Sequence, residues 1–259
     1  MTVNNLESIL EAVIPIVRKG GDKIMEIYQT DFEVKGKADS SPVTQADELA
    51  EQVMVPMLKA LLPGVPVIAE EAVAAGEIPE VADTFWLVDP LDGTKEFISR
   101  NGEFTVNVAL VKHGVAVLGV VYAPAQGRLF AGVVDSVAFI EHEDGRSDIR
   151  CRMAPAAGLT VVASRSHGDG SALDSFLSQG GHKVADVVNA GSSLKLCLVA
   201  AGEADMYPRL GRTMEWDIAA GHAVLSAAGG CVLAISGGPL GYGKPGFENP
   251  HFVAWGHVR

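Results

Sequence analysis

The chain has 259 residues, of which 48% are hydrophobic and 20% are charged, an ordinary composition for a globular protein. This length suffices for one large compact domain or for two packed halves of similar size. Acidic residues outnumber basic residues by 32 to 20, and the resulting net charge of −12 argues against general nucleic-acid binding, which requires a basic surface. An acidic protein can still bind phosphorylated small molecules where metal ions reverse the local charge.

The first half is predicted to contain two helices followed by a run of strands. Apolar residues at helical spacing predict the first helix, in which Pro15 and Gly20-Gly21 favour a bend. Polar, turn-like residues at 31–43 separate it from the second helix, for which Thr44 is a suitable N-cap. The expected elements are helices at 5–29 and 44–62 and strands at 65–68, 85–88, 104–122 (a hairpin turning at His113-Gly114) and 127–140.

The second half is predicted to alternate strands with helices. Gly229-Gly230 ends an alanine-rich helix, and residues 236–250 form a loop rich in Gly and Pro. The mixture predicts layered sheets and helices in one unit, with an α+β half at 1–145 and an α/β half at 146–259. The expected elements are strands at 159–163, 183–188, 204–207 and 252–255 and helices at 170–178, 192–201 and 215–228.

The cysteines and the amino-terminal sequence indicate the cellular compartment of the protein. Cys151, Cys197 and Cys231 lie far apart and form no CxxC pair, which argues against a zinc site or a disulfide framework and indicates a reducing compartment. No signal peptide and no apolar stretch of membrane-spanning length is recognisable. We therefore expect a cytoplasmic protein without an integral membrane segment. No feature predicts peripheral association with the inner membrane, which stays open as an alternative.

A predicted buried strand runs directly into two carboxylates, Asp89 and Asp92, three residues apart. Pro90 rigidifies the turn between them, and Gly93 and Thr94 lead into a possible helix start. Free backbone N–H groups at such a start attract phosphate oxygens. Metal-binding carboxylates beside a phosphate cradle are the groups that phosphoryl hydrolysis requires. Taken alone, each part of this loop also suits an ordinary turn.

Three further acidic positions stand at the ends of predicted elements. Glu70-Glu71 follows a strand, where paired carboxylates suit a hard cation or a solvated charge pair. Asp47 follows Thr44 at the spacing of a capping box, and Asp217 lies in the first turn of a helix, where an acid also favours the helix dipole. Each acid has a structural explanation, but together they predict a metal site.

Two runs resemble the signatures of the inositol monophosphatase superfamily. Residues 89–94, DPLDGT, resemble the DPxDGT signature, and residues 216–221, WDIAAG, resemble WDxAAG, while Glu70-Glu71 matches the acidic pair. The similarity extends over about 5–255 and is greatest to the CysQ-type 3′(2′),5′-bisphosphate nucleotidases. The runs that resemble this branch are 37–47, 95–107, 191–195, 207–209 and 250–252.

The resemblance implies a layered αβαβα sugar-phosphatase fold and a magnesium-dependent phosphatase. The implied reaction converts adenosine 3′,5′-bisphosphate to AMP and phosphate by means of metal-activated water, and it can extend to the sulfated analogue. Two or three Mg²⁺ ions, inhibition by lithium and a place in sulfur assimilation are further implications. The implied partner is a small phosphate ester rather than a nucleic acid, and homodimers are common in the superfamily.

The resemblance also assigns roles to residues of this chain. The implied metal ligands are Glu70, Asp89, Asp92, Asp217 and the carbonyl of Leu91. Asp47 and Thr94 would orient the attacking water, with Glu70 as a further catalytic group. The implied substrate-binding residues are Glu70, Leu91, Asp92, Gly93, Thr94, His167, Ser192, Lys195, Arg209 and Asp217.

One departure from the branch and two other functions stay open. Gly211-Arg212-Thr213 stands where a Gly-Pro-Thr turn is expected, so Arg212 either adds a cation near the substrate or faces solvent. The same metal site would serve an inositol-1-phosphate or fructose-1,6-bisphosphate phosphatase. A non-catalytic nucleotide-sensing regulator is the alternative of another class. A GxGxxG match at 241–246 contains Pro245 and links no strand to a helix, which argues against a dinucleotide site.

Overall fold

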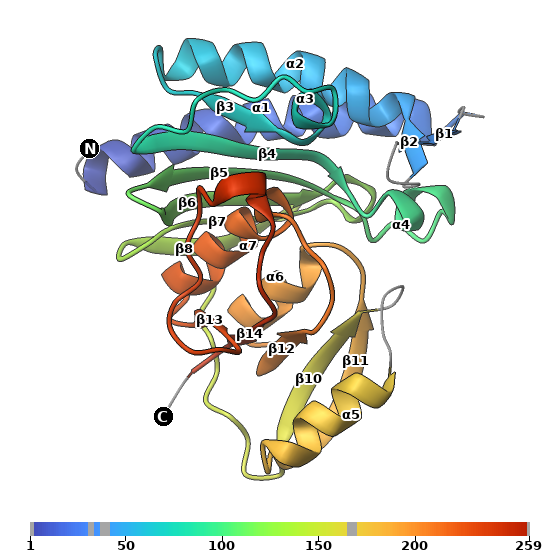
Figure 1. Ribbon diagram of the computed structural model, residues 1–259, viewed down its shortest axis with the longest axis vertical. Helices are drawn as coiled ribbons and strands as arrows, with labels where there is room; N and C mark the ends of the chain where they lie inside the picture. Colours follow the sequence, from blue (N-terminus) through green and yellow to red (C-terminus); the bar gives the residue numbers. More distant parts are fainter. Residues whose placement is uncertain (1–2, 31–33, 37–41, 165–169, 258–259) are drawn as a thin grey trace.

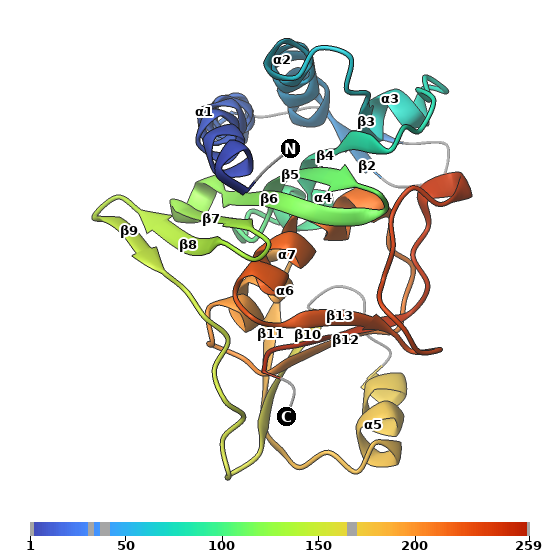
Figure 2. The same ribbon diagram turned by 90° about the vertical axis from the view of Figure 1, so that its left-hand side faces the viewer.

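Alternating layers of helices and sheets build the structure, a computed structural model that describes residues 3–30, 34–36, 42–164 and 170–257 (Figure 1). One pair of helices covers the outer face of a large sheet, a second pair lies between this sheet and a smaller one, and a single helix covers the far side (Figure 2). The predicted αβαβα order is therefore confirmed. The main helices are α1 (Val3–Tyr28), α2 (Gln45–Leu61), α5 (Gly170–Gln179), α6 (Leu194–Ala200) and α7 (Glu215–Ala227).

The larger sheet has seven strands in the order β3-β4-β5-β6-β7-β8-β9. β3 pairs with β4 in parallel, and every later neighbour pair is antiparallel. The predicted hairpin turns at His113 (φ 50°) and Gly114 (φ 77°), two positive φ angles that suit a two-residue turn between twisted strands. The strands are β3 (Val67–Ala69), β4 (Thr84–Asp92), β5 (Thr105–Lys112), β6 (Val115–Ala123), β7 (Arg128–Val133), β8 (Val137–His142) and β9 (Gly145–Asp148).

The smaller sheet has five strands in the order β11-β10-β12-β14-β13. β10 pairs in parallel with β11 and β12, whereas β14 lies antiparallel between β12 and β13. The chain changes from the larger to the smaller sheet between residues 148 and 159. The strands are β10 (Leu159–Ser164), β11 (Val184–Ala190), β12 (Met206–Arg209), β13 (Cys231–Ala234) and β14 (Phe252–Trp255).

Several short elements differ from the sequence prediction. The stretch expected to be turn-like contains β1 (Val34–Gly36), which pairs with β2 (Pro42–Thr44). A short helix, α3 (Glu70–Ala74), follows β3 directly, and β9 and β13 were also not expected. These elements are three to five residues long, so partners distant in the sequence decide their conformation. α1 is one helix although Pro15 lies inside it, and no described helix meets the length and hydropathy needed to span a membrane.

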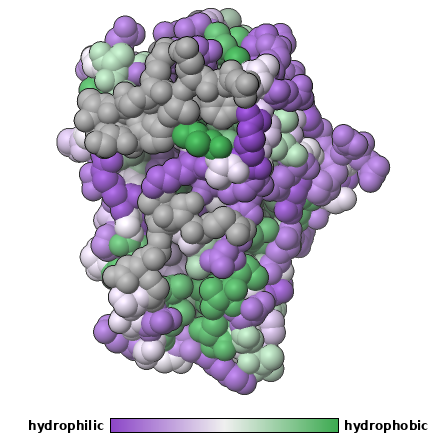
Figure 3. All heavy atoms as spheres, turned by 90° about the vertical axis from the view of Figure 1, so that its right-hand side faces the viewer, coloured by the Kyte–Doolittle hydropathy of each residue, from purple (hydrophilic) through white to green (hydrophobic). Residues whose placement is uncertain are grey.

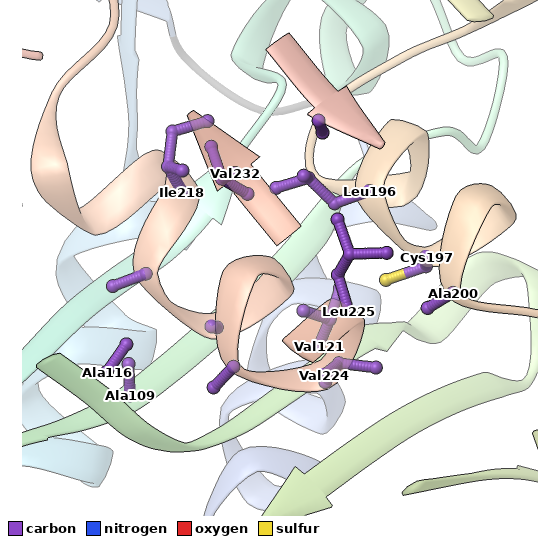
Figure 4. Close-up of a cluster of buried hydrophobic side chains, with 14 of the residues drawn as sticks. Ala109, Ala116, Val121, Leu196, Cys197, Ala200, Ile218, Val224, Leu225 and Val232 are labelled. Carbon is purple, nitrogen blue, oxygen red and sulfur yellow. The ribbon is translucent and has the colours of Figure 1, made fainter. Parts of the chain in front are cut away.

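Small residues let α7 pack closely on the larger sheet. A Cβ atom on Gly119 of β6 would lie 2.2 Å from the backbone oxygen of Ala220, and one on Gly132 of β7 would lie 2.9 Å from Ala227 Cβ. On its other side α7 packs against α6, where Leu196, Cys197 and Leu225 meet in a shared core (Figure 4). This close approach fixes the depth of α7 and therefore the position of its first turn, which carries Asp217.

We predict that Gly119→Ala lowers the free energy of unfolding by about 2–3 kcal/mol, because the added methyl group overpacks the contact between β6 and α7. Urea denaturation monitored by circular dichroism measures the change. Gly241→Ala is the matched control, since its Cβ atom would lie 3.8 Å from the nearest atom, and we expect a change below about 0.5 kcal/mol. Equal stability of the two variants would contradict close packing at this contact.

Candidate active site

A β-bulge at the end of β4 turns Asp89 and Asp92 toward the same cavity. In a regular strand, residues three apart point to opposite faces. Here Asp89 pairs with Asn107 and Asp92 with Thr105, so β4 has one residue more than β5 between these pairs. Pro90 lies in this interval and has no N–H group to donate to the neighbouring strand, and the Leu91 N–H donates to Asp89 Oδ1 at 3.0 Å.

A cavity of about 240 Å³ collects most of the predicted site residues. α3, β4, α4 (Thr94–Ile98), β12 and the starts of α6 and α7 contribute to its wall. Asp47 does not line it, and His167 lies outside the described residues. The predicted residues that line the cavity are Glu70, Leu91, Asp89, Asp92, Gly93, Thr94, Ser192, Lys195, Arg209 and Asp217.

Three carboxylates form a compact cluster in this cavity. Glu70, Asp89 and Asp217 each place one oxygen within 4.8 Å of the other two. Burial raises the pKa of Asp89 and Asp217 well above the ordinary value, and the neighbouring carboxylates raise it further. Met214 donates its N–H to Asp217 Oδ2 at 2.9 Å, so Asp217 also satisfies the backbone at the start of α7. An all-oxygen donor set with uncompensated negative charge fits a hard divalent cation.

Asp92 is not one of these three carboxylates, but its charge raises the pKa of Asp89 and Asp217, and it has polar partners of its own. Its Oδ2 atom lies 3.0 Å from Ser193 Oγ and 3.4 Å from Asn107 Nδ2. Burial raises the pKa of Asp92, while the charge of Lys195 and the hydrogen bond from Ser193 oppose the increase. No role was predicted from the sequence for Ser193 or Asn107. A polar side chain inside the apolar strand at 105–112 was the available signal for Asn107.

Gly93 and Thr94 build the start of α4 at the cavity. Gly93 has a φ of 89°, a conformation that favours glycine, and an added Cβ would crowd Ser192 Cβ at 3.2 Å. Thr94 is the first residue of α4 and lines the cavity. Asp47, in the first turn of α2, is 1% exposed, and its charge contributes to the raised pKa of Asp89. Asp47 therefore lies behind the cavity wall and still acts on it electrostatically.

The cavity wall also carries two cationic side chains, Lys195 and Arg209, whose charges act on Asp92 and Asp217. Lys195 is 6% exposed and donates to the Ser192 carbonyl, and burial lowers its pKa to about 8. Arg209 Nη2 donates to the Arg212 carbonyl at 2.7 Å. The Arg212 side chain is 62% exposed and its Nε donates to Glu248 at 3.3 Å, which places it at the rim. We call the carboxylate cluster the acidic pole of the cavity, and Lys195 with Arg209 its cationic pole.

Two hydroxyl groups in the cavity wall have unused hydrogen-bonding capacity. Ser192 Oγ and Thr213 Oγ1 are buried without a hydrogen-bond partner among the described residues. Ser192 has a φ of 43°, an uncommon conformation for a residue other than glycine. Thr213 was not among the predicted site residues. The face that carries α4 shows a band of hydrophilic side chains across its middle (Figure 3), which suits a charged ligand.

Comparison with known proteins gives consistent matches along nearly the whole chain. The inositol monophosphatase family matches residues 5–255. The 3′(2′),5′-bisphosphate nucleotidase CysQ of Escherichia coli K12 is 45% identical over 247 residues, 94% of this chain and 98% of that protein. CysQ of Buchnera aphidicola is 40% identical over 98% of this chain and 96% of that protein.

Solved structures give the same result. The crystal structure of CysQ from Bacteroides thetaiotaomicron, a bacterial member of the inositol monophosphatase family, is 38% identical with a TM-score of 0.81, covering 97% of this chain and 98% of that one. An IMPase from Thermotoga maritima is 28% identical with a TM-score of 0.77, covering 96% of this chain and 92% of that one.

We predict that Asp89→Asn stabilises the metal-free protein at pH 8 by roughly 1–3 kcal/mol, the usual cost of an uncompensated buried group. The folded state raises the pKa of Asp89, so the protonated carboxyl is favoured in the folded protein. The stability that this carboxyl contributes is therefore lost as the pH rises above its pKa in the unfolded chain, which is near 4. The advantage of the variant should therefore shrink as pH falls from 8 toward 4.5. Thermal unfolding in chelator across this range measures it.

Asp144→Asn, which removes an exposed carboxylate that does not line the cavity, serves as the charge-matched control and should not stabilise the metal-free protein. Added Mg²⁺ should raise the melting temperature of the wild type more than that of Asp89→Asn, because the cation neutralises the charge that the variant lacks. An Asp89→Asn protein that is less stable than the wild type in chelator at pH 8 would contradict the buried-charge interpretation.

Proposed function

The chain belongs to the inositol monophosphatase family, and we propose that it is a magnesium-dependent 3′(2′),5′-bisphosphate nucleotidase. It hydrolyses the 3′-phosphate ester of adenosine 3′,5′-bisphosphate and releases AMP and inorganic phosphate. The observation that carries this proposal is the pairing of a buried carboxylate cluster with Lys195 and Arg209 in one cavity. A substrate with two phosphate groups would place the scissile phosphate at the acidic pole and the second phosphate at the cationic pole. Relatives that are 40% and 45% identical are named as nucleotidases of this type.

The acidic pole is proposed to hold two or three Mg²⁺ ions. Glu70, Asp89 and Asp217 would be ligands, together with Asp92 and the carbonyl of Leu91. When bound, Mg²⁺ neutralises charge on the phosphate group and lowers the pKa of a water molecule that it coordinates. Oxygen ligands alone suit this hard cation, and the described part of the cavity offers no thiol or imidazole donor that would favour a softer metal.

The start of α4 is proposed to hold the scissile phosphate and the attacking water. The backbone N–H groups of Gly93 and Thr94 would donate to phosphate oxygens. The Thr94 hydroxyl would accept a proton from the water while the Asp47 carboxylate accepts the proton of that hydroxyl. Asp47 suits this role because it is buried behind the wall to which Thr94 belongs. No covalent intermediate is needed.

The cationic pole is proposed to bind the second phosphate and its ribose. Lys195 and Arg209 provide charge, and the unpartnered hydroxyl of Ser192 provides a hydrogen-bonding group. His167 keeps its predicted role on the nucleotide side. Arg212 reaches the rim of the same cavity, so we propose a minor contribution to phosphate attraction there.

The two alternative functions use the same site differently. An inositol-1-phosphate or fructose-1,6-bisphosphate phosphatase would share the acidic pole, but the IMPase from Thermotoga maritima is only 28% identical to this chain. A non-catalytic regulator would be favoured by the loss of a ligand acid, and every predicted acid is present. We also propose a cytoplasmic homodimer inhibited by lithium, as the family resemblance implies.

Phosphate release from parallel substrates tests the function. We expect magnesium-dependent release from adenosine 3′,5′-bisphosphate at a kcat/KM at least about 100-fold above that for inositol 1-phosphate or fructose 1,6-bisphosphate. The reaction should stop in chelator and slow with lithium. Preference for a sugar phosphate would reassign the substrate, and no release from any substrate by folded protein would exclude the enzyme.

Arg209→Ala should raise KM for adenosine 3′,5′-bisphosphate by roughly 10–100-fold, the effect of a lost charge-assisted hydrogen bond worth about 1.5–3 kcal/mol. The effect on 3′-AMP should be below about threefold, because that substrate has no second phosphate. Arg212→Ala, on the solvent side of the same cavity, should change either KM by less than about fivefold. Steady-state kinetics on both substrates measures the difference, and equal losses on both would argue against a second-phosphate role.

A further inference from the structure

Two adjacent glutamates at the start of α3 face different cavities. Glu70 lines the cavity that holds the carboxylate cluster. Glu71 lines a second cavity of about 690 Å³, which lies against α2 and α3. Successive residues of a helix point about 100° apart, so this separation depends on where α3 begins and how its first turn is oriented. The position of the Glu70 carboxylate is therefore set by whatever fixes the start of α3.

The start of α3 is held by a carboxylate from another helix. Glu51 of α2 accepts the Glu71 N–H through Oε2 at 2.9 Å and the Ala72 N–H through Oε1 at 3.0 Å. The N-cap residue of α3 is Ala69, which has no side-chain hydrogen bond to offer. Glu51 thus satisfies two backbone donors that the local sequence leaves without a capping side chain.

The helix that carries Glu51, α2, is anchored in the hydrophobic core. Glu51 lies four residues after Asp47, one turn further along the same side of the helix. Ala46, Ala50, Met54 and Leu58 anchor α2 in the core, each with 0% exposure. One helix therefore supplies both the buried carboxylate behind the cavity wall and the carboxylate that fixes α3.

We propose that Glu51 is a positioning residue for the metal site: by binding the Glu71 and Ala72 N–H groups, it holds α3 so that Glu70 stays in the cluster with Asp89 and Asp217. The proposal rests on the proposed magnesium site but not on the identity of the substrate. Without Glu51, the first turn of α3 has two unsatisfied N–H groups and is free to rotate or fray. Glu70 then leaves the cluster for part of the time, and the affinity for the cation falls.

Magnesium binding without substrate tests the proposal directly. Isothermal titration of Mg²⁺ into the full chain should show a 10–100-fold weaker affinity for Glu51→Ala, the usual effect of losing a group that orients a ligand. Glu51→Gln keeps one acceptor oxygen, so its affinity for Mg²⁺ should fall by only about 3–10-fold. Its kcat at saturating Mg²⁺ should stay within about threefold of the wild type, because high Mg²⁺ restores the cluster.

Glu77→Gln is the matched control, since Glu77 lines the same second cavity, is exposed, and is not in the proposed metal machinery. Its Mg²⁺ affinity should stay within twofold of the wild type. If Glu51→Ala fails to fold, Glu51→Gln decides the question alone.

The proposal is overturned if Glu51→Gln binds Mg²⁺ as tightly as the wild type. A lower melting temperature of the metal-free variant with unchanged Mg²⁺ affinity would also overturn it, because Glu51 would then have a structural role only. A wild type that binds Mg²⁺ but hydrolyses no nucleotide would refute the proposed function while leaving this inference intact.

Discussion

The repulsion among the clustered carboxylates is the constraint on which the site depends. Glu70, Asp89 and Asp217 bring three oxygens within 4.8 Å of one another, and Asp89 is almost fully buried. Like charges at this distance in a desolvated site oppose folding unless protons or cations neutralise them. A protein retains such a cluster where a cation binds it, so the same acids that destabilise the metal-free state give the loaded state its chemistry.

The surrounding architecture fixes these acids in place from three directions. The bulge at Pro90 turns the end of β4 toward the cavity, and the close packing of Gly119 against Ala220 sets the depth of α7 and hence of Asp217. Glu51 holds the start of α3, which carries Glu70. Each acid therefore belongs to a different element with a separate support, and a change far from the cavity is expected to move one ligand at a time.

The sequence predicted the long elements and the acidic pole because their signals are local. Helical spacing marked α1, the Thr44 N-cap marked α2, and the alanine-rich run before Gly229-Gly230 marked α7. The run from Asp89 to Thr94 marked the phosphatase loop. The contributions of Ser193 and Thr213 were missed, because their partners and their burial depend on tertiary contacts that the local sequence does not show. Asn107 was missed although a polar side chain inside an apolar strand was a local signal. α3 was missed because a helix of five residues capped by Glu51 cannot be inferred from its own sequence.

The proposed function requires one cavity to bind metal ions at its acidic pole and a second phosphate at its cationic pole. A crystal structure with Mn²⁺ and the product AMP tests it most directly, because the metal is located by anomalous scattering. We expect anomalous peaks bounded by Glu70, Asp89 and Asp217, with the AMP phosphate at Lys195 and Arg209. Metal bound elsewhere, or AMP with its phosphate in the carboxylate cluster, would contradict it.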